Sequence, residues 1–509
     1  MTAPSVSALA SPQFTRREAL GLLALGLAAA HARAANSTPS LVRHEPLSVA
    51  PSAPIPAGKR VTGDWPAFSL GGQPVLLRPP AAPNWPAGAA WLRITTAIDD
   101  REPRFIAVSE GGGGRALGKF DLRFAHAIET FQLELPAAAV AEVRARGIEL
   151  KLEGTGAPMW FFTDGAPVPP ELKPHLLFAP ADVDRVAEFH RRVASVGSVQ
   201  AFGWMEGCLM EGLAALDRRA PGGRYATARE AHWKLFVPSR GKLVYEDPRS
   251  NRVEGKVYGI EGALPFADLA RRDPTSPVLD IFVQFAKAHR RQDGAIQDAG
   301  TTTGEGTYTI GYPLAMIAAA RRDAALAELA REQLRLRIQR LWHEGAIWLR
   351  RTDKKAYTFR GWARGVAWHS LGIASSLEPL RQQGATAEFD AELKRIAAWV
   401  LPLQRADGLW SCFIEDKKSP PDTSGSAGIA AALAIGARLG VLPTEARTAA
   451  QRTITGVQAH LTPDGLVDGV AQSNRGGEDL QRSDYRVLGQ IGMGLLALLI
   501  AECGEVPRV

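Results

Sequence analysis

Two glutamates in unusual local surroundings are the residues best suited to acid–base chemistry. Glu305 lies in the run 303–308, whose two glycines pack poorly but let the backbone approach a ligand closely. Glu261 lies at the start of another predicted helix, four residues before Pro265. Either residue could instead act as a helix cap, because acids are favoured at helix N-termini. If both glutamates share one pocket, they could transfer protons to and from a substrate.

Aromatic, basic and hydroxyl residues recur at the same kind of place, just before or within the first turns of predicted helices. Flat rings suit pyranose faces and a guanidinium suits a carboxylate, so the combination predicts a site for an acidic sugar. The binding candidates of this kind are Trp204, Tyr308, Trp362, Arg364, Trp368, His369, Thr423, Ser424 and Tyr485. Structural roles stay open for several: Arg364 as an ion-pair partner, Trp368 as core, His369 as a packed histidine, and Thr423 with Ser424 as part of an N-cap.

Helical periodicity after about residue 180 indicates what positions these residues. Twelve helical stretches are predicted at 182–194, 202–219, 223–237, 260–272, 276–291, 306–320, 323–344, 362–382, 386–404, 422–439, 443–461 and 485–502. Amphipathic stretches alternate with stretches that are small or apolar all round, which is typical of helices buried on all sides. Six inner and six outer helices predict an (α/α)6 barrel, in which the N-termini of the inner helices gather at one rim. Their dipoles and unpaired N–H groups would favour an anionic ligand there.

The segment before the helices has a different period. Phe120, Leu122 and Phe124 alternate with polar residues, as do the runs 131–135 and 148–152. This period of two predicts a small antiparallel β-sandwich over residues 59–178, followed by the catalytic barrel over 179–509. Trp160 could be an exposed sugar platform, but a buried contact between the domains is favoured.

The N-terminus has the composition of an export signal. Arg16 and Arg17 precede an apolar stretch at 21–30, and Ala32-Arg33-Ala34 forms a small-residue cleavage site. This pattern predicts a twin-arginine-type signal over residues 1–34 and a Pro/Ser/Ala-rich linker over 35–58. We therefore expect a periplasmic or secreted protein without stable membrane insertion.

Composition narrows the classes of function further. The chain has 509 residues, 22% of them charged, a net charge of +7 and three widely spaced cysteines. These values favour a globular protein with no dense disulfide framework, and the scattered basic residues give little support for nucleic-acid binding. No metal or cofactor motif is present, so none is expected, whereas the positive charge suits an anionic oligosaccharide. The oligomeric state is not predicted.

Several of these segments resemble the unsaturated glucuronyl and rhamnogalacturonyl hydrolases, glycoside hydrolase families 88 and 105. The resemblance covers roughly residues 200–504. The segments that carry it are Trp362–Trp368, similar to W-x-R-G-N-x-W; Asp407–Trp410, similar to a G-x-W segment; Asp422–Ala427, similar to E-T/A-S-x-[ST]-A; Glu305 with Tyr308 and Pro313–Ala315; and Ile260-Glu261.

The resemblance implies an (α/α)6 barrel and particular roles for single residues. Glu305 takes the place of the family's general acid/base aspartate, and Glu261 takes the place of a second aspartate. Arg364 and Trp368 match binding positions, and Trp410 joins the binding candidates. This sequence departs from the family pattern by having glutamates for both aspartates, Thr303 for a tryptophan, Val366 for an asparagine and Ser411 for a histidine. These departures imply a distant branch with changed specificity.

Three functions follow as hypotheses. The favoured one removes a terminal 4,5-unsaturated uronyl residue by acid-catalysed hydration. The second is a glycosidase of saturated β-glucuronides or a uronate lyase, the lyase using Tyr308 or Tyr485 with His369. The third is a carbohydrate-binding protein without activity.

Overall fold

The computed structural model describes residues 42–50, 54–297, 300–489 and 491–504, all within one compact unit. The predicted export signal at 1–34 lies outside the described residues. Cys208, Cys412 and Cys503 are buried and form no disulfide bond with one another. The described helices include none with the length and apolar character that crossing a membrane requires.

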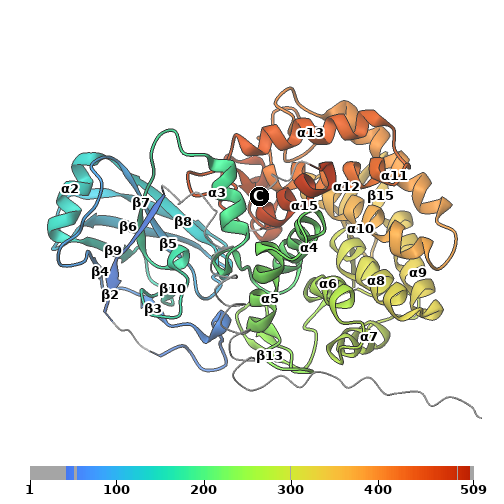
Figure 1. Ribbon diagram of the computed structural model, residues 1–509, viewed down its shortest axis with the longest axis horizontal. Helices are drawn as coiled ribbons and strands as arrows, with labels where there is room; N and C mark the ends of the chain where they lie inside the picture. The colour runs from blue at the N-terminus through green and yellow to red at the C-terminus, as the bar shows by residue number, and fades with distance from the viewer. Residues whose placement is uncertain (1–41, 51–53, 298–299, 490, 505–509) are drawn as a thin grey trace, which may run out of the picture. The chain divides into compact units, whose positions relative to one another are not determined.

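Two antiparallel sheets form the N-terminal part, as the period-two patterns predict (Figure 1). One sheet has the order β1-β11-β5-β8 and the other β2-β4-β9-β6-β7, with a separate pair β10-β3. The strands are β1 Arg43–Pro46, β2 Ser48–Val49, β3 Ala67–Leu70, β4 Val75–Arg78, β5 Ala90–Thr95, β6 Pro103–Glu110, β7 Ala116–Arg123, β8 Thr130–Leu135, β9 Ile148–Leu152, β10 Met159–Phe162 and β11 His175–Phe178, and helix α2 spans Ala137–Arg146. Phe120 pairs with Ile106 in register, and both are buried in the core of this part.

The predicted linker needs correction at its C-terminal side. Strands β1 and β2 lie within the range 35–58 and pair with β11 and β4. Leu47, between them, is fully buried, so this short segment completes the edges of both sheets. Its high Pro and Ser content hid two edge strands, the place where such residues are tolerated.

Helices dominate the rest of the chain, and 44% of all the described residues are helical. Six helices are buried nearly all round: α4 Trp204–Arg219, α6 Pro265–Arg272, α8 Tyr312–Arg321, α10 Ala363–Arg381, α12 Thr423–Arg438 and α15 Ile491–Cys503. Each packs against the next in this order, and α15 packs against α4. Glycines permit the closest of these approaches, since a Cβ added at Gly212 would lie 2.5 Å from the carbonyl oxygen of Gly494.

More exposed helices cover these six. They are α3 Arg185–Val193, α5 Arg224–Phe236, α7 Val278–Ala288, α9 Ala324–Leu341, α11 Ala387–Val400 and α13 Thr444–Gln458, together with the short α14 Gly477–Arg482. Each of the first six contacts at least one buried helix, for example α5 with α4 and α9 mainly with α8. In Figure 1 these paired helices follow one another from green to red.

The structure shortens three of the predicted helical stretches at their starts. The stretch from 260 is a 3-10 turn, Ile260–Gly262, and α6 begins only at Pro265, a residue suited to a first helical position. The stretch from 306 opens with a π-helical turn, Thr307–Gly311, before α8. The stretch from 485 opens with strand β19, so Tyr485 precedes the helix rather than starting it.

Short strands interrupt the helical part near the N-terminal ends of the buried helices. They are β12 Val244–Glu246, β13 Arg252–Glu254, β14 Thr301–Thr303, β15 Trp342–His343, β16 Ala346–Thr352, β17 Tyr357–Arg360, β18 Val470–Ala471 and β19 Arg486–Val487. β16 pairs with β14, β15 and β17, and β18 pairs with β19. The helical period did not indicate these hairpins.

Buried polar contacts join the sheets to the helices. The Asp464 carboxylate lies 2.5 Å from the Arg93 guanidinium of β5 and 3.0 Å from that of Arg192 in α3. These two arginines hold the pKa of Asp464 well below its usual range, against the opposing effect of burial. Trp160 is 7% exposed and belongs to the core that the helices form, so the favoured buried contact is confirmed.

Candidate functional site

A cavity of about 320 Å³ lies at the N-terminal ends of α4, α8 and α10. Its lining brings together six of the residues that the sequence singled out: Trp204, Glu261, Glu305, Trp362, Arg364 and Trp368. The volume is at the small end of the range for ligand pockets, roughly 300–1,000 Å³. Two carboxyl groups, three indoles and a guanidinium thus share one concave site.

Backbone pairing places Glu305 at this cavity. The preceding strand β14 pairs with β16, and the Gly304 amide donates to the Leu349 carbonyl at 2.8 Å. A Cβ at position 304 would lie 3.1 Å from the Gly365 carbonyl, so glycine allows the strand to approach α10 closely. Glu305 itself is 8% exposed.

A polar relay reaches Glu305 from the other wall. The Asn474 amide nitrogen donates to the Glu305 carboxylate at 3.4 Å, and Arg350 donates to the Asn474 amide oxygen at 2.9 Å. A guanidinium thus polarises the amide that contacts the acid. These two hydrogen bonds contribute to the orientation of the Glu305 carboxyl group.

Glu261 lies on the 3-10 turn before α6, and its side chain is partly exposed. Gly203, at φ 114°, precedes α4, and a Cβ there would lie 2.7 Å from the Glu261 carbonyl oxygen. The turn and the start of α4 therefore pack together. Arg475 is close enough to Glu261 for the Glu261 charge to raise the pKa of Arg475, against the larger effect of burial.

Arg364 is bound within the wall of the cavity. Its guanidinium donates to the carbonyls of Ala471 at 2.9 Å and Gln472 at 2.5 Å, and it lies 4.7 Å from the Trp362 ring. Burial lowers the pKa of Arg364, while the charges of Asp422 and Glu305 oppose that effect. Arg364 therefore anchors the loop that carries Asn474 and adds positive potential.

The indoles pack edge to face around this guanidinium. The Trp204 and Trp368 ring centroids lie 5.7 Å apart at 84°. His126, from the loop between β7 and β8, lies 5.8 Å from Trp204. Burial and the charges of Arg475, Arg364 and Arg101 lower the pKa of His126 well below its usual value, so it stays neutral.

Two lining residues carry a buried polar atom without a hydrogen-bond partner in the described part of the chain. These atoms are His126 Nε2 and Ser473 Oγ. Buried polar groups are nearly always hydrogen-bonded, so such atoms indicate a site that a polar ligand or water completes.

Other predicted site residues lie outside the lining of this cavity. Tyr308 is fully buried and stacks on Trp368 and Tyr312 at 6.1 and 5.5 Å. His369 lies 3.1 Å from the Glu392 carboxylate. Both residues support the lining from behind.

The remaining candidates make structural contacts as well. The Trp410 indole donates to the Val400 carbonyl at 2.8 Å, and Thr423 donates to the Asp468 carbonyl at 2.8 Å. Ser424 interacts with Asp422, which caps α12. The Tyr485 hydroxyl accepts from the Arg123 amide at 2.9 Å and so contacts the β-sandwich.

Several lining residues were missed in the sequence. They are Arg101, His126, Tyr258, Arg350, Ser473, Asn474 and Arg475, with the loop Asp247–Arg249. The polar, glycine-flanked run 473–477 was the one local signal for a ligand loop, whereas Arg101 and His126 come from the sandwich.

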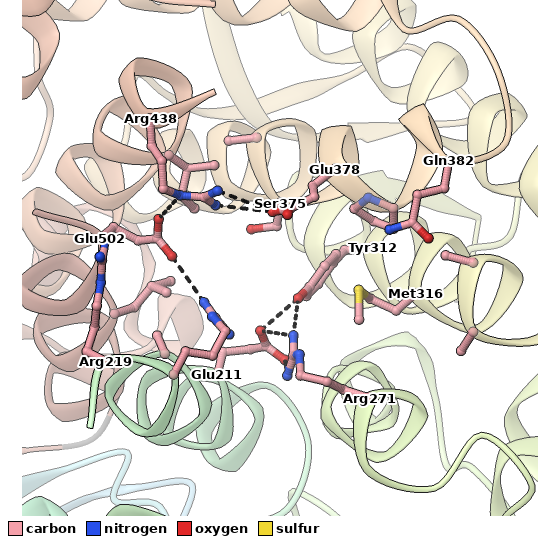
Figure 2. A pocket seen from close by; sticks show the side chains of 18 residues that line it. Glu211, Arg219, Arg271, Tyr312, Met316, Ser375, Glu378, Gln382, Arg438 and Glu502 are labelled. Atoms are coloured by element: carbon pink, nitrogen blue, oxygen red, sulfur yellow. Dashed lines mark hydrogen bonds and ion pairs between the residues drawn. The ribbon is translucent and has the colours of Figure 1, made fainter. Parts of the chain in front are cut away.

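A second, larger cavity of about 540 Å³ lies at the C-terminal ends of the same helices (Figure 2). Here the Glu211 carboxylate lies 3.0 Å from Arg271 and accepts from the Tyr312 hydroxyl at 2.7 Å. Glu502 pairs with Arg438 at 2.6 Å and with Arg218 at 3.1 Å. Because its charges neutralise one another, this cavity is the weaker candidate despite its size.

In neither cavity, nor elsewhere in the described ranges, do three or more His, Cys, Asp or Glu side chains gather to hold a metal ion.

Comparison with known proteins identifies a family model and two relatives that parts of this chain resemble. Residues 321–506 match the model of Glycosyl Hydrolase Family 88. The chain is 35% identical over 92 residues to "Protein Atu3128" of Agrobacterium fabrum and to the "24.9 kDa protein in picA locus" of Rhizobium radiobacter. Each match covers 18% of this chain, and the chain spans 40% of the length of these curated relatives.

Solved structures show the same fold at low sequence identity. A possible member of family 105 from Salmonella enterica serovar Paratyphi A is 16% identical, with a TM-score of 0.54 over 62% of this chain and 92% of that one. A family 105 glycoside hydrolase from C. acetobutylicum is 16% identical, with a TM-score of 0.54 over 63% and 98%. At these identities the solved structures show that this chain shares their fold. The resemblance of this chain to the glycoside hydrolases of families 88 and 105 is thus confirmed.

Proposed function

We propose that this protein is a glycoside hydrolase that removes a terminal 4,5-unsaturated uronyl residue from an anionic oligosaccharide. The observation that carries the proposal is the joint presence of Glu305 and Glu261 in one cavity walled by indoles and arginines. We also propose that the cycle of contacts from α4 to α15 closes an (α/α)6 barrel around this cavity.

The proposed reaction begins at the enol ether of the unsaturated ring. Glu305 donates a proton to C4, and positive charge develops at C5 and the ring oxygen. Water adds at C5 and returns a proton to Glu305, while Glu261 orients that water or a ring hydroxyl. The resulting hemiketal opens and releases the rest of the saccharide. The indoles exclude water and present flat faces to the sugar.

Arg364 was expected to hold the substrate carboxylate. Its two bonds to backbone carbonyls give it a positioning role instead, whereas its charge still favours an anion in the cavity. Arg350 is half-buried beside Asn474 and is the better placed of the two to meet the carboxylate of the reacting ring.

Two other reactions use the same residues. With a saturated β-glucuronide, Glu305 would protonate the leaving oxygen and Glu261 would act as base or nucleophile. A lyase would need a tyrosine and a histidine at the substrate. Tyr258 and His126 are the pair that lines this cavity, in place of Tyr308 or Tyr485 with His369.

One assay separates the three reactions. The full chain is incubated with a lyase-generated unsaturated disaccharide, with a saturated glucuronide and with an intact uronate polysaccharide, while absorbance near 235 nm and reducing sugar are followed. Hydration lowers the absorbance, a plain glycosidase releases sugar without changing it, and a lyase raises it. Loss of absorbance that is absent in Glu305→Gln and retained in Tyr258→Phe supports the proposal; a flat trace with the unsaturated disaccharide contradicts it.

Export is a separate proposal. We propose that residues 1–34 direct the folded protein to the periplasm. Replacing Arg16 and Arg17 by lysine should leave the uncleaved protein in the cytoplasm, as measured by fractionation.

A further inference from the structure

The β-sandwich contributes side chains to the candidate site. Arg101 follows β5 and His126 follows β7, and both line the cavity together with residues of the helical part. The loop that carries Asn474 also contacts the sandwich, since the Gln472 amide donates to Glu129 at 2.9 Å and to the Arg123 carbonyl at 3.0 Å. The sandwich therefore helps to build this wall.

Two arginines from distant parts of the chain converge on this wall. Arg101 and Arg475 both reach the Asp99 carboxylate, at 3.2 and 3.5 Å, and both donate to the Pro248 carbonyl. Asp99 is nearly buried, with its side chain 4% exposed. One carboxylate thus faces two guanidiniums.

Two cations lie close together here, and the charges of Asp99, Glu261 and Glu129 partly offset their repulsion. Burial lowers the pKa of Arg475, and the charge of Arg101 lowers it further, so the two cations repel each other. The exposed Arg249, next to Pro248, lines the same cavity and adds a third cation. Paired guanidiniums suit carboxylate and sulfate oxygens, because their N–H groups form charge-assisted and bidentate hydrogen bonds.

The arginines lie at a different depth from the proposed acid. Trp362, Arg364 and Trp368 are each 1% exposed, and Glu305 is 8% exposed. The Arg475 side chain is 16% exposed and that of Arg101 is 39% exposed. A ring that reacts at Glu305 occupies the deep end, and the next sugar therefore meets the arginines near the opening.

We propose that Arg101 and Arg475 form a subsite for an acidic group, a carboxylate or a sulfate ester, on the sugar next to the reacting uronyl residue. This inference rests on the proposed function, since it assigns the substrate of the same cavity. It makes the β-sandwich part of the substrate site and gives the enzyme a preference for saccharides with a second negative charge.

The test compares three disaccharides that share the same unsaturated uronyl residue. Its neighbour is an unsulfated hexosamine derivative, the same sugar with a sulfate ester, or a uronic acid. The full chain, Arg101→Gln and Arg78→Gln are compared; Arg78 is an exposed arginine on β4 that does not line the cavity. The ratio of kcat/KM for an acidic neighbour to that for the neutral one should fall about 10- to 100-fold in Arg101→Gln, mainly through KM. Arg78→Gln should keep the wild-type ratio.

The two acidic disaccharides show whether the subsite binds a sulfate ester or a carboxylate. A changed ratio for the sulfated sugar alone assigns the subsite to sulfate, and for the uronic acid alone to carboxylate. Equal losses on all three disaccharides would place Arg101 at the reacting ring and overturn the proposal, as would an unchanged ratio on both acidic ones. Thermal melts exclude misfolding of the variant, and Arg101→Lys, which keeps the charge, should retain part of the preference.

Binding separates this inference from the proposed function. Calorimetry with the same three disaccharides and Glu305→Gln measures affinity without turnover. If wild type turns over none of them, the proposed reaction is wrong; the subsite still stands if Arg101→Gln, combined with Glu305→Gln, weakens binding of the acidic disaccharides selectively.

Discussion

The two cavities at opposite ends of α4, α8 and α10 differ in size and, more informatively, in how their charges are balanced. The cavity at the C-terminal ends is larger, about 540 against 320 Å³. Its glutamates lie in direct ion pairs with arginines of the last helical turns, where cations are favoured by the helix dipole (Figure 2). In the smaller cavity two arginines reach the Asp99 carboxylate, and two lining side chains, His126 and Ser473, carry a buried polar atom without a partner in the described residues. Buried polar atoms that lack a hydrogen-bond partner, rather than a large volume, therefore indicate which cavity is the ligand site.

The largest expected contrast is between the acids of the two cavities. Glu305→Gln should lower kcat about 10²- to 10⁴-fold, because it removes the proposed proton donor. Its unfolding free energy should stay close to that of wild type. Steady-state rates and thermal melts measure both. Glu344→Gln, which changes an exposed glutamate in a turn, serves as the matched control. If Glu305→Gln lost activity only in proportion to its loss of folded protein, Glu305 would not be the proton donor.

The equivalent change in the larger cavity should act on stability. Glu211→Gln leaves Arg271 and the Tyr312 hydroxyl without their shared carboxylate, so we expect a loss of about 3 kcal/mol. The kcat of the molecules that remain folded should not change. Urea denaturation gives the free energy of unfolding, and active-site-corrected rates give kcat. A fall in kcat at full folding would show that this cavity takes part in catalysis.

Acidification should affect the smaller cavity through His126. The pKa of His126 lies well below 6.5 in the folded protein, so unfolding takes up a proton at lower pH and stability falls as pH falls below about 6.5. Between pH 6.5 and pH 5, wild type should lose about 2 kcal/mol more than His126→Gln. Among the residues that line the larger cavity, within the described ranges, there is no histidine. Equal losses in wild type and His126→Gln, measured by denaturation at both pH values, would mean that His126 is charged when folded.

The smallest expected effect concerns the relay behind Glu305. Asn474→Ala removes the amide between Glu305 and Arg350, and kcat should fall about tenfold with little change in KM, because the acid loses orientation rather than contact with substrate. Asn84→Ala, in a loop of the sandwich, is the control. A change confined to KM would make Asn474 a substrate-binding residue instead.

Local pattern was sufficient for the twelve predicted helices and for part of the site, but not for the edge strands β1 and β2 or the hairpins between the helices. Each predicted helical stretch overlaps an observed helix, because a buried face leaves its period in the chain. Glu261 and Glu305 share a cavity because both directly precede buried helices that run side by side. Arg364 and Trp368 share it because residues four apart lie on one helix face. His369 does not line it, since the next residue along a helix points about 100° away.

No local sequence pattern predicted other features of the site. Tyr485 was predicted to start a helix but lies before a strand, and its hydroxyl bonds to the sandwich backbone. Arg101 and Arg475 are more than 300 residues apart, and no period or motif links them. Only folding brings them to the same aspartate.

The order of residues along the chain thus determines the helices, the sandwich strands and the two acids, because each depends on neighbours within a few turns. The tertiary structure alone decides which side chains share a cavity, which charges are neutralised within the protein and which remain for a ligand. Those outcomes depend on contacts between residues hundreds of positions apart, and the β-sandwich is joined to the site through such contacts.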